Sequence, residues 1–149
     1  MNEICENAQG FLTELITAMR FDLKVDAEWA DEGCCIDLSG DDSHFALAEN
    51  GELLDAFEVL LFQLYGRDLG REHRFVVDAE QFRKTRKAEL HAMARFAAEQ
   101  VRKNGRPFTF GVLNSTERRI IHMTLQKEDD LFTESVGDGR DRRLQVRLQ

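Results

Sequence analysis

The spacing of hydrophobic residues predicts alternating helices and strands along this 149-residue chain. Four segments carry apolar residues at helical spacing: 4–19, 50–66, 79–103 and a segment that starts at residue 114 or 115. Six others have the alternation or the short apolar runs typical of strands: 21–29, 34–38, 74–77, 107–112, 131–136 and 142–148. The stretch "SGDDSH" between the second strand and the second helix is predicted to be a loop.

Polar residues at the ends of these segments support the helix boundaries. Asp78 and Gln81 have the spacing of a capping box at the start of the long helix 79–103. Asn104-Gly105 is the pair that favours a left-handed cap at its end. Glu117 is placed to reach back to the first residue of the helix that begins at 114 or 115.

The predicted order is α-β-β-α-β, a long helix, and then β-α-β-β. The turn "GDGRD" joins the last two strands as an antiparallel hairpin. Hairpins and segregated helices indicate the α+β class and not a doubly wound parallel sheet. We therefore expect two domains, residues 1–78 and 79–149, with the helix 79–103 shared between them.

The two halves of the chain differ strongly in charge. The net charge is −8, but residues 1–70 contain 16 Asp and Glu against 3 Lys and Arg. Residues 71–149 contain 12 Asp and Glu against 17 Lys and Arg. Such asymmetry favours a surface for nucleic acid or another polyanion in the C-terminal half, although a net charge of this size also fits an ordinary solvated surface.

Several classes of function find no support in the sequence. Cys5, Cys34 and Cys35 are odd in number and have no metal-ligand spacing, so we expect reduced thiols and no metal site. We find no phosphate loop and no nucleophile elbow, and therefore expect neither an enzyme nor a cofactor. The N-terminal residues lack a signal-peptide pattern, and the most apolar stretch, "FEVLLFQLYG", is too short to span a bilayer. We expect a cytoplasmic protein that does not insert into a membrane.

The best candidate for a binding site is the segment "STERRIIHMTLQ", residues 115–126. On a helix Arg118 and His122 lie on one face, with Arg119 beside them. A guanidinium can bind a phosphate and stack on a base, and an imidazole adds a donor or a stacking ring. The same pattern by itself also describes the solvated face of a short helix.

The surrounding sequence resembles a known family. "NSTERRIIH" followed by "TESVGDGRDRR" is similar to the R-three-H domain, named for an arginine and a histidine separated by three residues. The preceding "FDLKVDAEWADEGCCIDLSGDD", "ENGELLDAFEVLLFQLYG" and "VVDAEQFRKTRK" look like the KH module of the Jag (SpoIIIJ-associated) family. That family joins a type II KH domain to an R-three-H domain, and the resemblance covers residues 8–148.

The resemblance implies a bacterial, cytoplasmic protein that binds single-stranded RNA, or single-stranded DNA, without catalysis. Carried over by position, Arg118 and His122 are the name-giving pair, Arg119 is the adjacent basic residue, and Arg142 and Arg143 precede the last strand. Further basic residues are candidate phosphate contacts: Arg83, Lys84, Arg86, Lys87 and Arg147. Arg147, which alternates with Gln145 and Arg143, could equally protect an edge strand.

The KH-like half departs from its pattern at the loop that should clamp the nucleic-acid backbone. A KH domain uses a GXXG loop, which aligns here with Ala48, Glu49, Asn50 and Gly51. The first glycine is lost, and a carboxylate stands where a phosphate should bind. We therefore expect this half to serve as a scaffold or a protein-contact surface. The alternative is a module for a protein partner or self-association in which nucleic-acid binding has decayed.

Overall fold

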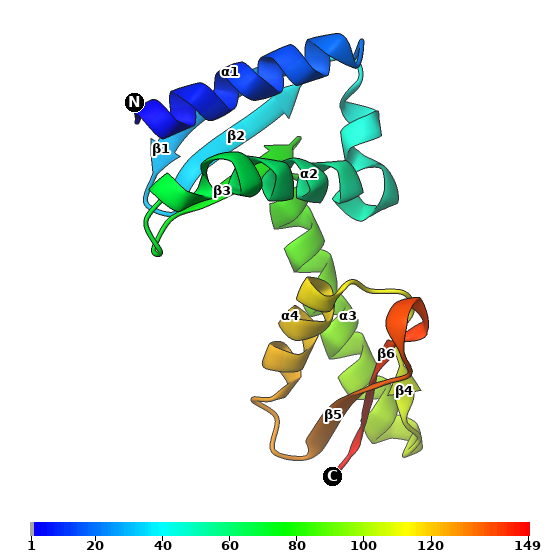
Figure 1. Cartoon of the computed structure of the whole chain (residues 1–149). Helices are drawn as coiled ribbons and strands as arrows, with labels where there is room; N and C mark the ends of the chain where they lie inside the picture. The colour runs from blue at the N-terminus through cyan, green and yellow to red at the C-terminus, as the bar shows by residue number, and fades with distance from the viewer. Residues whose placement is uncertain (1) are drawn as a thin grey trace. The chain divides into compact units, whose positions relative to one another are not determined.

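The computed structural model describes residues 2–149, and the chain divides into two compact units after Arg83. The elements up to that point are α1 Glu3–Ala18, β1 Lys24–Ala30, β2 Gly33–Ser39, α2 Ser43–Tyr65, the 3-10 turn η1 Gly66–Asp68 and β3 Arg74–Ala79 (Figure 1). The remaining elements are α3 Phe82–Asn104, β4 Phe108–Thr109, α4 Ser115–Leu125, β5 Leu131–Val136, the 3-10 turn η2 Gly139–Asp141 and β6 Arg143–Leu148. The predicted α+β class is confirmed.

The N-terminal unit is a three-stranded sheet covered on one face by α1 and α2 (Figure 1). β1 pairs antiparallel with β2, and β3 pairs parallel with β2. Val25, Leu38 and Ala79 share one row of the sheet, and all three are buried with the helices. Because successive side chains point to opposite faces, the alternate residues lie on the face that the helices leave open.

The opposite face of this sheet carries a row of like charges. Asp26 is paired with Asp37, which is paired in turn with Asp78, so three aspartates lie side by side across the strands. Burial and the carboxylates of Asp78 and Asp26 raise the pKa of Asp37 above its usual range. The acidic excess of this half is therefore concentrated partly on one sheet face.

Helix α2 is interrupted where the sequence places the KH-like loop. Ala48 has extended backbone, and Glu49, Asn50 and Gly51 have φ of 53°, 56° and 78°. The helix therefore consists of two segments joined by a left-handed turn. The prediction of a loop over "SGDDSH" was wrong at its ends, since Ser39 still belongs to β2 and the residues from Ser43 onward are helical.

The predicted capping box at the start of the long helix is also wrong. Glu80 and Gln81 have φ of 51° and 56°, so the helix begins only at Phe82. Asp78 still accepts a hydrogen bond from the backbone N–H of Arg83 at 3.2 Å. The other end agrees with the prediction, because Gly105 has φ 71° and its N–H donates to the carbonyl of Val101 at 2.9 Å.

The C-terminal unit packs α3 and α4 on a three-stranded antiparallel sheet of order β4-β6-β5. Its core includes Leu90, Val101, Ile121 and Val146, each no more than 1% exposed. The predicted hairpin of β5 and β6 is confirmed, whereas the predicted strand 107–112 shrinks to the two residues of β4.

The expectation of three reduced cysteines was wrong. A disulfide joins Cys5 on α1 to Cys34 on β2, with their Cα atoms 5.3 Å apart, and Cys35 remains free. The two sulfurs meet because α1 packs across the sheet, a contact that the spacing of the cysteines does not reveal. Over residues 2–149, no helix is long and apolar enough to cross a membrane.

Candidate nucleic-acid interface

The predicted arginine–histidine pair opens onto a cleft between α4 and the edge strand β5. The cleft has a volume of about 440 Å³ and is lined by Ser115, Arg118, Arg119, His122, Thr133, Glu134, Ser135, Arg142 and Leu144. Four of the five principal candidates, Arg118, Arg119, His122 and Arg142, thus share one hollow. Residues far apart in the sequence meet here because α4 packs beside β5.

The start of α4 is held firmly, which positions the basic residues of its first turns. Asn114 and Glu117 form a complete capping box: the Asn114 side chain accepts from the N–H of Glu117 at 2.8 Å, and the Glu117 carboxylate accepts from the N–H of Asn114 at 3.2 Å. Arg118 follows directly, and its Nη1 donates to the carbonyl of Leu113 at 2.8 Å. One donor of the Arg118 fork is therefore used to orient the side chain, and the others remain available to a ligand.

His122 is oriented by the neighbouring strand. Its Nδ1 forms a hydrogen bond with the hydroxyl of Thr133 on β5. Since Nδ1 is occupied, the Nε2 edge of this exposed ring is the one available to a ligand. Arg118 and His122 are therefore oriented by contacts with Leu113 and Thr133, which the sequence pattern did not predict.

The remaining basic candidates differ in their hydrogen-bond partners and in whether they line the cleft. Arg119 and Arg142 are exposed. Arg119 makes no ion pair within residues 2–149, and the Arg142 guanidinium donates through Nη1 to the carbonyl of Gly137 at 3.1 Å. Arg143 does not line the cleft. In the β5–β6 register it lies opposite Val136, on the face of the hairpin away from Ser135 and Leu144, and its side chain donates to the carbonyl of Arg140 at 3.0 Å.

Two of the additional candidate phosphate contacts already have anionic partners. Arg83 makes ion pairs with Asp55 at 3.0 Å and Glu58 at 2.7 Å, and Arg86 makes one with Glu117 at 2.5 Å. A guanidinium so engaged is a poor phosphate ligand.

The other three additional candidates are more exposed. Lys84 and Lys87 have no carboxylate within salt-bridge distance in the described part of the chain. Arg147 lies 4.6 Å from the ring centre of Phe132, on the outer face of the hairpin. That contact fits protection of the strand more directly than contact with a ligand in the cleft.

Sequence reasoning missed the hydroxyl groups of the cleft. Thr133 and Ser135 share the face of β5 that carries the buried Leu131, and Ser115 stands at the first turn of α4. A signal was present in "LFTESV", where two hydroxyl residues occupy the positions that the alternation assigns to the inner face. Hydroxyls can donate to phosphate oxygens, so they extend the set of donors. Glu134 is the one acidic residue of the cleft lining.

The KH-like loop is exposed but carries the wrong charge. Ala48, Glu49 and Asn50 are exposed, while Gly51 is buried against the ring of Phe82. A Cβ at Gly51 would lie 2.7 Å from that ring, which explains why the last glycine of the motif is needed here. The turn is left-handed at Glu49, Asn50 and Gly51, and the carboxylate of Glu49 would repel a phosphate.

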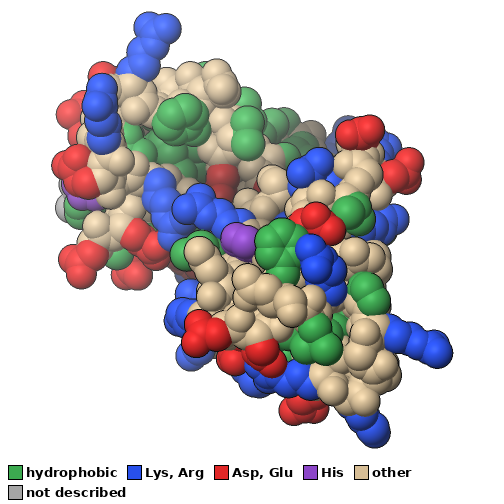
Figure 2. All heavy atoms as spheres, turned by 90° about the horizontal axis from the view of Figure 1, so that it is seen from below, with side chains coloured by type: hydrophobic (Ala, Val, Ile, Leu, Met, Phe, Trp, Pro, Cys, Tyr) green, Lys and Arg blue, Asp and Glu red, His purple; other side chains and the backbone are tan. Residues whose placement is uncertain are grey.

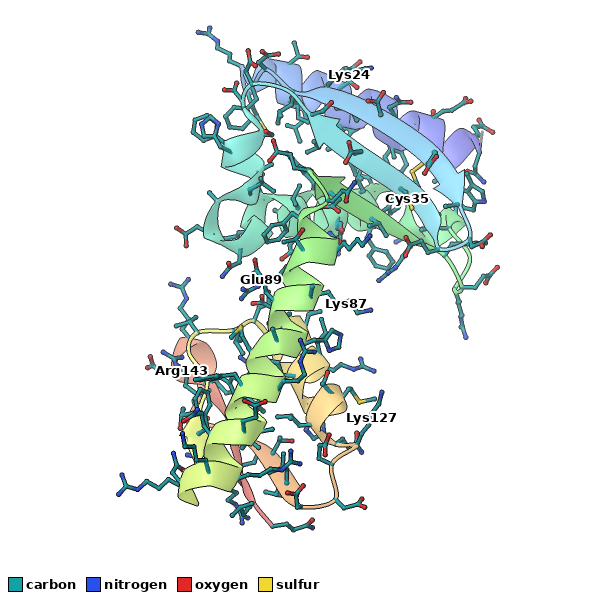
Figure 3. All side chains as sticks on the ribbon, turned by 180° about the vertical axis from the view of Figure 1, so that it is seen from behind. Lys24, Cys35, Lys87, Glu89, Lys127 and Arg143 are labelled. Atoms are coloured by element: carbon teal, nitrogen blue, oxygen red, sulfur yellow. A yellow bond between two sulfur atoms is a disulfide. The ribbon has the colours of Figure 1, made fainter. Side chains whose placement is uncertain are left out.

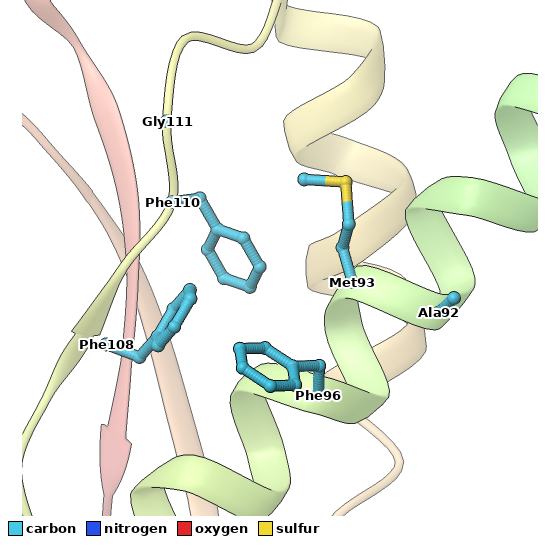
Figure 4. A pocket seen from close by; sticks show the side chains of 6 residues that line it. All are labelled: Ala92, Met93, Phe96, Phe108, Phe110 and Gly111. Carbon is cyan, nitrogen blue, oxygen red and sulfur yellow. The ribbon is translucent and has the colours of Figure 1, made fainter.

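A second hollow of the C-terminal unit has a different character (Figure 4). It measures about 340 Å³ and is lined by Ala92, Met93, Phe96, Phe108, Phe110 and Gly111. The rings pack edge to face, with centroids 6.0 Å apart for Phe96 and Phe108 and 5.1 Å apart for Phe108 and Phe110. Its lining, drawn from the described residues, contains no charged or polar side chain, so this hollow lacks the donors found beside Arg118.

The two units differ in net charge: the N-terminal unit is acidic and the C-terminal unit is basic. The chain from residue 84 onward contains 14 Lys and Arg against 9 Asp and Glu, whereas the part up to Arg83 has 6 against 19. Figure 2 shows one face of the molecule on which Lys and Arg side chains gather beside a histidine. The basic excess thus belongs to the unit that contains the cleft.

Comparison with known proteins assigns this unit to a class. Residues 88–148 match the R-three-H domain family, so the C-terminal unit is an R-three-H domain. The whole chain is similar to the RNA-binding protein KhpB of Clostridium symbiosum, with 27% identity over 146 residues, 97% of this chain and 66% of the relative. It is also similar to the RNA-binding protein KhpB of Bacillus subtilis (strain 168), with 32% identity over 111 residues, 73% of this chain and 53% of the relative.

These relationships confirm the resemblance to the Jag family. The chain spans between half and two thirds of the length of these two relatives. The R-three-H domain is matched directly by its own family, and the relationship of the N-terminal unit rests on the two KhpB proteins.

Proposed function

We propose that this protein binds single-stranded RNA, or single-stranded DNA, through the cleft between α4 and β5. The observation that carries the proposal is the convergence of Arg118, Arg119 and Arg142 with the imidazole of His122 in one hollow of an R-three-H domain. Guanidinium groups bind phosphate oxygens strongly, and both guanidinium and imidazole planes can stack on an unpaired base. The two relatives named as RNA-binding proteins support RNA over DNA.

The charges within the cleft suggest how a strand would lie. The three arginines and the hydroxyls of Ser115 and Ser135 supply donors, whereas Glu134 on β5 repels phosphate. Phosphates are therefore expected nearer α4, with a base toward the strand. No catalytic step is needed for this function, and the RNA should be recovered intact.

We assign the N-terminal unit a supporting role as a scaffold or a protein-contact surface. Glu49 in the clamp loop and the aspartate row of Asp26, Asp37 and Asp78 both disfavour a polyanion. A basic protein segment or a second copy of the chain would be the matching partner. The competing view, that nucleic-acid binding has decayed altogether, is weakened by the intact set of donors in the cleft. A cytoplasmic location is part of the same proposal.

The proposal is tested by titrating labelled single-stranded RNA and DNA with wild type and with Arg118→Ala/His122→Ala at several salt concentrations. Binding should weaken with salt, with a log–log slope of roughly −0.7 per neutralised phosphate, and the double variant should bind more weakly with a shallower slope. Arg95→Ala is the control, because Arg95 is exposed on α3 and lines neither the cleft nor the apolar hollow. Absence of binding by wild type at low salt would refute the proposal.

A further inference from the structure

A second groove lies on the other side of α4, between this helix and α3. Its volume is about 310 Å³, and it is lined by Lys87, His91, Thr116, Arg119, Ile120, Met123, Thr124 and Lys127. All of these residues belong to the C-terminal unit. The lining includes three cations and no carboxylate, in contrast to the cleft that contains Glu134.

The cations of this groove are not neutralised by neighbours. Lys87, Arg119 and Lys127 are exposed, and none of them has a carboxylate within 4.0 Å among residues 2–149. Figure 3 shows Lys87 on α3 and Lys127 just after α4 projecting to the same side of the two helices. Arg83 and Arg86, on the first turns of the same helix α3, are by contrast paired with acidic side chains. The three cations that line the groove therefore keep their charge available to a ligand.

His91 lines the groove and is oriented by a contact with Thr124 on α4. The Thr124 hydroxyl donates to the carbonyl of Ile120 at 2.8 Å and lies 3.0 Å from Nδ1 of His91. Because the hydroxyl has a single proton, it accepts from Nδ1–H when it donates to the carbonyl. Nε2 is then free to interact with a ligand, as proposed for the ring of His122.

The groove has two apolar lining residues, and it meets the cleft at Arg119. Met123 is 52% exposed, and Ile120 lies beside it one turn earlier. An exposed thioether next to free cations offers a flat apolar contact for a base or a ribose. Arg119 lines both hollows, so the groove and the cleft meet at this side chain.

We propose that the groove is a second subsite for single-stranded nucleic acid, reached by the strand as it passes Arg119 from the cleft. Lys87 and Lys127 bind phosphates, the ring of His91 stacks on a base or accepts a hydrogen bond from it, and Met123 supports a sugar or base face. This inference rests on the proposed function, since it extends the same bound strand. A second subsite predicts that the protein contacts more nucleotides of the strand than the cleft alone would contact.

The test compares oligouridine RNA of about 4 to about 12 nucleotides, lengths that fall within the single-strand site sizes of about 4–16 nucleotides. The variants are Lys87→Ala/Lys127→Ala and the matched control Lys103→Ala/Arg106→Ala, which removes two exposed charges near the end of α3. For long RNA, the groove variant should lose about tenfold in affinity at low salt. The magnitude of its salt slope should fall by about 1.4, which corresponds to two phosphates. For the shortest RNA, the groove variant and the control should bind alike.

The outcomes separate this inference from the proposed function. If wild type binds RNA but the groove variant matches the control at every length, the second subsite is refuted and the cleft stands. If wild type shows no binding at any length, the proposed function itself fails. Thermal unfolding of the groove variant should be unchanged, and a His91→Ala variant with a length-dependent loss of its own would support the assignment further.

Discussion

Arg86 on α3 and Glu117 on α4 form the most buried ion pair in the described part of the chain. Nε of Arg86 lies 2.5 Å from Oε2 of Glu117, and the two side chains are 17% and 9% exposed. The other oxygen of Glu117 accepts the N–H of Asn114 in the capping box. One carboxylate therefore both starts α4 and ties it to α3, so the helix that carries Arg118 and His122 is anchored at its first turn.

Replacing Glu117 by Ala should therefore destabilise the C-terminal unit. The change leaves the half-buried Arg86 without its main partner and removes half of the capping box, so we expect a loss of about 3 kcal/mol in the free energy of unfolding. Glu89→Ala is the control, because Glu89 contacts the same guanidinium from a side chain that is 55% exposed. That control should cost less than about 1 kcal/mol. Urea denaturation measures both, and equal losses would contradict the structural role of Glu117.

Two neighbouring positions of the left-handed turn in α2 should respond in opposite directions. Gly51→Ala should cost about 1–3 kcal/mol, because φ is 78° and the new Cβ would meet the ring of Phe82 at 2.7 Å. Asn50→Gly should be neutral or stabilise by up to about 1 kcal/mol, since Asn50 already has φ 56° and is exposed. Chemical denaturation of the two variants is the measurement. A Gly51→Ala protein as stable as wild type would contradict the positive φ of Gly51 and its close contact with Phe82.

The aspartate row should make the N-terminal unit more stable in mild acid. The pKa of Asp37 is raised in the folded state, chiefly by burial and then by Asp78 and Asp26, so the folded protein binds a proton more readily than the unfolded chain. Stability should therefore rise as the pH falls from neutral through this raised pKa. Asp37→Asn should be more stable than wild type at pH 7, within about 1 kcal/mol, and the difference should shrink on acidification.

The control for this effect is Asp31→Asn, because Asp31 is exposed in the turn between β1 and β2 and outside the row. It removes the same charge from the same unit, and its stability difference from wild type should not depend on pH in this window. Thermal unfolding followed across the acidic range gives both curves. A pH-independent gain in Asp37→Asn would argue against repulsion between the aspartates.

Reduction of the disulfide should weaken the N-terminal unit. The bond between Cys5 and Cys34 closes a loop with a sequence separation of 29, for which chain entropy predicts about 3–4 kcal/mol. Wild type and Cys35→Ser should lose this stability in reductant, whereas Cys5→Ala/Cys34→Ala should not respond to reductant. Thiol titration of the denatured protein provides an independent check. Detection of three thiols before reduction would contradict the disulfide.

Reversing the charge of the KH-like loop should strengthen RNA binding. Ala48→Gly/Glu49→Lys restores a glycine and a cation where the exposed turn could approach a phosphate, and we expect a gain of about three- to tenfold at low salt. Glu52→Lys makes the same charge reversal outside the loop and is the matched control. An equal gain in both variants would indicate a general charge effect and not a recovered clamp.

The sequence by itself determined the order of elements and the helix face that carries the candidate site. Periodicity is a local property, so Arg118 and His122 could be placed on one face of a helix, and Asn114 and Glu117 at its start, before any tertiary contact was known. Resemblance to a family then singled out this face among several charged ones. Where local backbone departed from the common conformations, as at Glu80 and Gln81, the helix boundary was misjudged.

The tertiary structure alone decided which groups meet. Thr133 contacts His122, and Arg86 is paired with Glu117, because β5 and α3 pack against α4 from distant parts of the chain. Cys5 and Cys34 are joined because α1 crosses the sheet. Packing also distinguishes cations that are paired, such as Arg86, from cations that are not, such as Lys87 and Lys127, since a charge pattern along a chain does not specify which carboxylate lies within reach in space.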